Sequence, residues 1–141
     1  MTKKIGLGLL IVSFIAVTLP LFYLPTSIFT FILYSFAVLI IFGIAVGLIF
    51  VDQPFKASWV PIILLNLIFT VANSMVGVMI DGKVTELAKK SNSNDFEMVK
   101  QATDGLSLVK DTFLSFCWVV GISLIALLIL KQIRKLRTGL E

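Results

Sequence analysis

Three long stretches without a charged residue constrain this chain more than any other feature of its sequence. They cover residues 5–51, 57–80 and 112–130, and they are 47, 24 and 19 residues long. A helix needs about 20 mainly apolar residues to cross the hydrocarbon core of a bilayer, so the second and third stretches fit one crossing each and the first fits two. Hydrophobic residues make up 58% of the chain and charged residues 14%, an apolar excess that a soluble fold of this size cannot bury.

Prolines divide the longest stretch into two helices. Pro20 and Pro25 disfavour helix continuation, and Thr26 or Ser27 can cap a new helix. The sequence therefore predicts an all-α protein, a single transmembrane domain over residues 1–141 built as an integral membrane four-helix bundle. The helices are expected at about 4–22, 27–50, 58–80 and 112–131, with residues 81–111 outside the membrane.

The distribution of basic residues predicts the orientation of the chain. Four crossings leave both termini on the same side of the membrane, together with seven of the twelve Lys and Arg residues. On the opposite side, residues 81–111 contain five lysines and six acidic residues. The positive-inside rule then places both termini in the cytoplasm, and we expect a bacterial inner membrane. The basic residues 131–137 are expected to contact anionic membrane lipids, whereas the uncharged spans leave no basic face for a nucleic acid.

Residues 81–111 form the largest part of the chain that is expected to lie in water. An apolar helical face continues outward from the third helix, and a second apolar stripe with spacings of three and four residues leads into the fourth. This pattern predicts an extracytoplasmic helical hairpin between helices 3 and 4. Its stripe either only seals the two arms together or binds another protein or a second copy of the chain. The candidate partner-binding residues are Val84, Leu87, Phe96, Met98, Val99 and Leu106.

Polar residues are predicted to lie on one face of the third helix. Asparagine in a membrane helix is unfavourable unless it forms hydrogen bonds, so this face should turn toward other helices or toward water. It could hold helices together, line a pathway for a small solute or ion, or meet the helix of a partner. The residues of this candidate polar face are Asn66, Thr70, Asn73, Ser74, Gly77 and Asp81.

Gly43 and Gly47 form a G-x-x-x-G motif in the second helix. Glycines at this spacing allow two helix backbones to approach closely. We expect the motif to pack against another helix of the same chain, and the alternative is that it mediates dimerisation.

The chemistry-bearing residues are few. The sequence has no histidine, and its single cysteine, Cys117, cannot form an intramolecular disulfide. It contains no phosphate-binding glycine loop, metal-ligand cluster or nucleophile–base pair, so we expect a protein that is not an enzyme and needs no cofactor. The expected function is binding of a membrane or periplasmic protein, as in small four-span immunity proteins, accessory subunits and sensor modules. The alternative is a small homo-oligomeric channel or transporter with its pathway along the polar face of helix 3.

Overall fold

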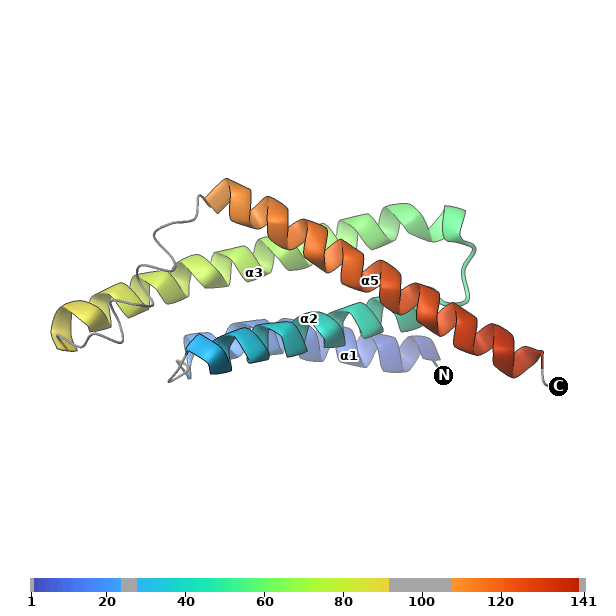
Figure 1. Ribbon diagram of the computed structural model, residues 1–141, viewed down its shortest axis with the longest axis horizontal. Helices are drawn as coiled ribbons and strands as arrows, with labels where there is room; N and C mark the ends of the chain where they lie inside the picture. Colours follow the sequence, from blue (N-terminus) through green and yellow to red (C-terminus); the bar gives the residue numbers. More distant parts are fainter. Residues whose placement is uncertain (1, 24–27, 92–107, 140–141) are drawn as a thin grey trace.

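The computed structural model describes residues 2–23, 28–91 and 108–139, and their regular structure is entirely helical (Figure 1). Each of the four α-helices is long enough and apolar enough to cross a membrane. The predicted helical class and the four candidate spans are therefore confirmed. The elements are α1 (Thr2–Thr18), the 3₁₀-helix η1 (Leu19–Leu21), α2 (Ile28–Phe50), α3 (Phe55–Ser91) and α5 (Leu108–Thr138).

Helices α3 and α5 extend well beyond the uncharged stretches that predict them. They contain 37 and 31 residues, which correspond to about 55 and 46 Å, whereas the hydrocarbon core is about 30 Å thick. Helix α3 was expected over 58–80, and α5 over 112–131. Both extensions are rich in Lys, Arg, Leu, Gln, Glu and Ala, which favour helices in water as well.

Helix α2 lies at the centre of the molecule. It packs most extensively against α1 and α5, and α3 packs against α5 and, over a smaller area, against α1. Both termini lie at the same end of the molecule (Figure 1), as an even number of crossings requires. Three aromatic rings join α1, α2 and α3: Phe42 stacks on Phe69 with 3.9 Å between centroids, and Phe14 meets the Phe69 ring edge-on at 5.5 Å.

Glycines allow the backbones around α2 to approach closely. A Cβ atom on Gly43 would lie 2.7 Å from Cγ2 of Ile122, and one on Gly47 would lie 2.7 Å from Cδ1 of Leu130. The G-x-x-x-G motif of α2 therefore lies against α5 of the same chain. Gly6 of α1 lies equally close to α2, because its Cβ would be 3.0 Å from the carbonyl oxygen of Ala45.

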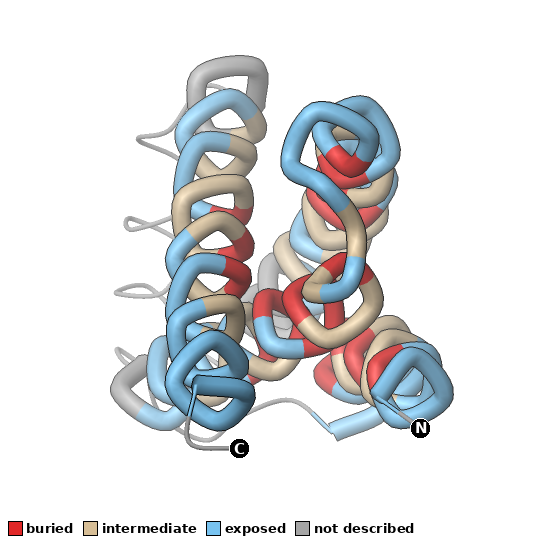
Figure 2. The backbone as a smooth tube through the Cα atoms, turned by 90° about the vertical axis from the view of Figure 1, so that its right-hand side faces the viewer, coloured by how far each residue is buried: buried red, intermediate tan, exposed pale blue. Residues whose placement is uncertain are grey.

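The outer faces of the helices are apolar. Buried positions turn toward the space between the helices, and exposed positions form the outside of the molecule (Figure 2). Water would not tolerate so continuous an apolar surface, whereas lipid tails cover it without loss. Each α-helix carries large apolar side chains that are more than half exposed, such as Ile11, Leu33, Val60 and Leu128.

Polar contacts fix both ends of the helix assembly. At the end that carries the termini, Asp52 forms an ion pair with Arg134, and Nζ of Lys131 donates a hydrogen bond to the carbonyl oxygen of Gln53 at 2.9 Å. At the opposite end, Nζ of Lys83 donates to the carbonyl oxygen of Leu21 at 2.6 Å. The segment that follows α2 is thereby attached to α5, and the segment that follows α1 is attached to α3.

Replacing Gly43 tests the packing of α2 on α5. Gly43→Leu is expected to lower the free energy of unfolding by about 1–3 kcal/mol, because the new side chain must displace Ile122 and the backbone beside it. Thermal unfolding in detergent micelles measures the change. Gly8→Leu is the matched control, since a Cβ on Gly8 meets no described atom within 4 Å. Equal unfolding midpoints for the two variants would contradict this packing.

Candidate functional site

A buried hydrogen-bonded cluster lies between α3 and α5. Asn66, Thr70 and Ser123 have at most 1% of their surfaces exposed. Oγ of Ser123 donates a hydrogen bond to Oδ1 of Asn66 at 2.8 Å, which is a direct bond between the two helices. Nδ2 of Asn66 donates to the carbonyl oxygen of Ile62 at 2.7 Å, and Oγ1 of Thr70 donates to the carbonyl oxygen of Asn66 at 2.8 Å. Both ends of the Asn66 amide are thus satisfied inside the protein.

A second polar contact follows about two helical turns further along α3. Oγ1 of Thr112 donates a hydrogen bond to Oγ of Ser74 at 3.2 Å, again between α5 and α3. The adjacent Asn73 is half-buried and lines a cavity of about 130 Å³ between α2, α3 and α5. The other lining residues of this cavity are Phe36, Leu39, Ser115, Trp118 and Val119.

The predicted polar face does not act as a single surface. Asn66, Thr70 and Ser74 take part in the contacts just described. Gly77 is exposed, and a Cβ there would meet no described atom within 4 Å, so it lies outside the interface. Asp81 is half-buried at the end of the apolar span of α3 and takes part in a polar interaction of its own.

The polar side chains that α5 contributes to this site were missed from the sequence. Thr112, Ser115 and Ser123 lie at i, i+3 and i+11, with the buried Val119 at i+7, which places all four on one helical face. That spacing could have indicated them. Each is a common, short side chain within an apolar run, so the pattern becomes distinctive only beside the asparagines of α3.

The structure describes only part of the predicted partner-binding hairpin. Val84 and Leu87 lie in the last turns of α3, which continues as a helix to Ser91. Residue Leu108 begins α5. The remaining candidates lie outside the described residues, namely Phe96, Met98, Val99 and Leu106.

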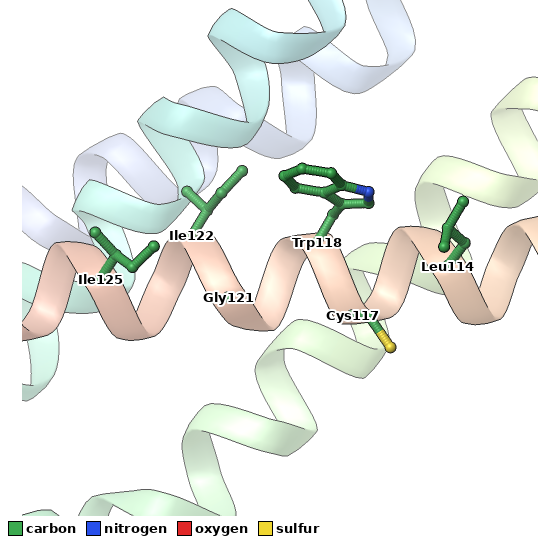
Figure 3. Close-up of a pocket in the computed structure, with 6 residues that line it drawn as sticks. All are labelled: Leu114, Cys117, Trp118, Gly121, Ile122 and Ile125. Atoms are coloured by element: carbon green, nitrogen blue, oxygen red, sulfur yellow. The ribbon is translucent and has the colours of Figure 1, made fainter.

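An apolar groove of about 270 Å³ runs along the outer side of α5. Trp118 and Ile122 extend to one side of the helix, and Cys117 extends to the other (Figure 3). Gly121 lies between them, and a Cβ there would meet no described atom within 4 Å. The groove is lined by Leu114, Cys117, Trp118, Gly121, Ile122 and Ile125.

A double-mutant cycle tests the bond between Asn66 and Ser123. We expect Asn66→Ala and Ser123→Ala to couple by about 0.5–2 kcal/mol in the free energy of unfolding, because each removes the same interhelical hydrogen bond. Ser13→Ala is the control, since Oγ of Ser13 bonds within its own helix to the carbonyl oxygen of Leu9. Its effect should add to that of Asn66→Ala. Additivity in both pairs would show that the interhelical bond does not form.

The polar groups between the spans are amides and hydroxyls, which can donate and accept hydrogen bonds but supply no acid–base pair. Within the described residues, no group of three or more His, Cys, Asp and Glu side chains is placed to hold a metal ion. The site can therefore join helices or bind a neutral polar group. Comparison of this chain with protein-family models, curated proteins and solved structures finds no match.

Proposed function

We propose that this chain is a non-enzymatic protein of the bacterial inner membrane that binds another membrane or periplasmic protein. Its four helices form a bundle in the bilayer, both termini lie in the cytoplasm, and residues 81–111 form a helical hairpin on the opposite side. The binding surface is the apolar stripe of that hairpin. Immunity proteins, accessory subunits and sensor modules are the functional classes that such an arrangement suits.

The length of α3 is the observation that carries this proposal. The apolar part of α3 ends at Lys83, but the helix continues for eight residues to Ser91, about 12 Å further. Helix α5 begins at Leu108, four residues or about 6 Å before its apolar part begins at Thr112. Two helices that leave the apolar zone at the same end support an extramembrane structure in the chain between them.

The bonding of the internal polar residues favours binding over transport. Asn66 and Thr70 were the deepest candidates for lining a pathway, and both are fully buried and hydrogen-bonded within the protein. A residue that lines an aqueous pathway should instead present its polar atoms to an open channel. The described part of α3 therefore fits a helix held by polar contacts better than it fits the wall of a pore.

Charge introduced into the stripe tests the binding surface. A photo-crosslinker at position 98 should form a discrete adduct with a second protein in native membranes. Val99→Asp combined with Leu106→Asp should reduce the adduct about tenfold, because a charge at the centre of an apolar interface costs about 1.4 kcal/mol or more. Asn94→Asp adds a charge to the same segment outside the stripe and should leave the adduct unchanged. If this chain forms adducts only with itself, the result would indicate a homo-oligomer. Equal adduct yields from the wild type and all variants would show that the hairpin is not the binding surface.

A small oligomeric channel or transporter is the second candidate, because Asn73 faces a cavity instead of a bonded partner. Under our proposal, liposomes that contain the purified protein should release small solutes and ions no faster than protein-free liposomes. Flux that is present in the wild type and altered by Asn73→Leu in a folded variant would favour the channel.

A further inference from the structure

Three polar side chains within the spans lack the hydrogen bonds that the other internal polar residues form. Asn66, Thr70 and Ser123 are bonded within the protein. In the described part of the chain, Asn73, Ser115 and Trp118 form no hydrogen bond through their side chains. All three line the same cavity of about 130 Å³.

These three side chains are open to an external partner. Among the described residues that are not exposed, no side-chain nitrogen or oxygen is both sealed from the surface and unpaired, so the polar atoms of Asn73 and Ser115 are reachable from the cavity or the outside. Trp118 is itself 58% exposed. An amide, a hydroxyl and an indole supply N–H and O–H donors, and none of the residues that line the cavity carries a charge. In a low-dielectric environment such donors favour a neutral acceptor within reach.

The size of the cavity limits what can enter it. Pockets for drug-sized molecules measure about 300–1,000 Å³, and a water molecule takes up about 30 Å³. A cavity of about 130 Å³ therefore fits a small polar group, but not a whole solute of drug size. The rest of any larger ligand must lie outside it.

The groove on α5 provides the place for that remainder. Trp118 lines both the cavity and the apolar groove of about 270 Å³, so the two are neighbours on one side of the molecule. Gly121, which lies between Ile122 and Trp118 on the helix (Figure 3), contributes an uncovered surface to the groove. A small recess that contains a few hydrogen-bond donors, beside an apolar groove, matches a ligand with one polar group and a hydrocarbon chain.

The depth of the cavity indicates which ligand this is. Counted along the helices, Ser115 lies about 6 Å inside Asp111, and Asn73 lies about 12 Å inside Asp81. The polar zone of a bilayer is about 5–8 Å thick on each side of the hydrocarbon core. With the two aspartates in the headgroup layer, Ser115 lies at the boundary between this polar zone and the acyl chains, where the ester carbonyls of glycerolipids are found, and Asn73 lies about one helical turn deeper.

We propose that this recess binds one diacylglycerolipid, with its two ester carbonyls accepting hydrogen bonds from Asn73, Ser115 and Trp118 and an acyl chain in the groove over Gly121. A lipid is favoured over a second protein helix because ester carbonyls surround the protein at this depth at bulk concentration, and mass action fills even a weak site. The site lies on the side of α5 within the span, and its occupation does not depend on the proposed binding of a partner by residues 81–111.

Native mass spectrometry of the full chain, released from mixed micelles of detergent and phosphatidylcholine, tests the site. We expect one diacyl phosphatidylcholine to stay bound to each wild-type chain. The dialkyl ether analogue has the same chains and headgroup but no ester carbonyls. It should be retained about fivefold less, as loss of hydrogen-bond acceptors requires. Equal retention of the two lipids would overturn the role of the donors.

Variants locate the bound lipid. Gly121→Leu fills the groove and should reduce retention of both lipids, whereas Gly8→Leu, which also adds a side chain to an open helix surface, should not. Asn73→Leu should remove the preference for the ester lipid. Ser115→Ala should weaken that preference, and this variant deletes only a hydroxyl that forms no bond to the described protein. Unchanged retention and preference in all of these variants would overturn the proposal.

The competing occupant of the groove is a second copy of this chain. Cys117 lies in the groove and is the only cysteine, so mild oxidation of the protein in liposomes reports directly on such a contact. A monomer after oxidation is the expected result. A disulfide-linked dimer without retained lipid would assign the groove to self-association and overturn the lipid site.

Discussion

The lack of water in the hydrocarbon core determines how this chain places its polar residues. A polar group in a membrane span must find its partner in the protein or in the lipid, because no solvent can supply one. Asn66 meets this constraint most completely. Its side-chain amide is hydrogen-bonded to Ser123 on α5 and to the backbone of α3, and its backbone carbonyl oxygen accepts a hydrogen bond from Thr70. Apolar side chains can exchange one neighbour for another or for lipid at little loss. The directional bond to Ser123 is therefore what fixes the position of α3 against α5.

Close packing provides the rest of the cohesion between the helices. Lipid tails are as apolar as leucine, so burial of apolar surface between spans yields little free energy, and dense contact between backbones matters more. Gly6, Gly43 and Gly47 supply this contact on two sides of α2, and the stack of Phe42 on Phe69 fills the space toward α3. Because Gly43 and Gly47 already lie against α5, the motif is occupied within the chain and is not available for dimerisation, the alternative role considered for it.

The spans were predictable from the sequence because the transfer of charge into hydrocarbon is so unfavourable that charged residues mark their limits. The ends of the helices were not predictable, because residues such as Lys135 favour the helix in water too and continue it beyond the span. The inward position of Asn66 was also predictable. Its bond to Ser123 was not, because the partner depends on where two helices cross, and Gly77 carries no side chain that would reveal which side of α3 it occupies.

The two long helices extend furthest beyond the expected spans at opposite ends, and this asymmetry bears on the proposed function. Helix α5 extends at the end that carries the termini, where Arg134 and Lys131 attach it to the connection that follows α2. Helix α3 extends at the other end, toward the segment proposed to bind a partner. A force on that segment acts on α3 and α5 together, which are joined at Ser74–Thr112 and again at Asn66–Ser123. Relative movement of the two helices would break both bonds, and the fully buried Asn66–Ser123 bond lies where neither water nor a lipid carbonyl offers a substitute. Under the proposed function, the arrangement therefore suits immunity proteins and accessory subunits, which hold a partner at a fixed height above the membrane, better than sensor modules, which transmit a movement across it.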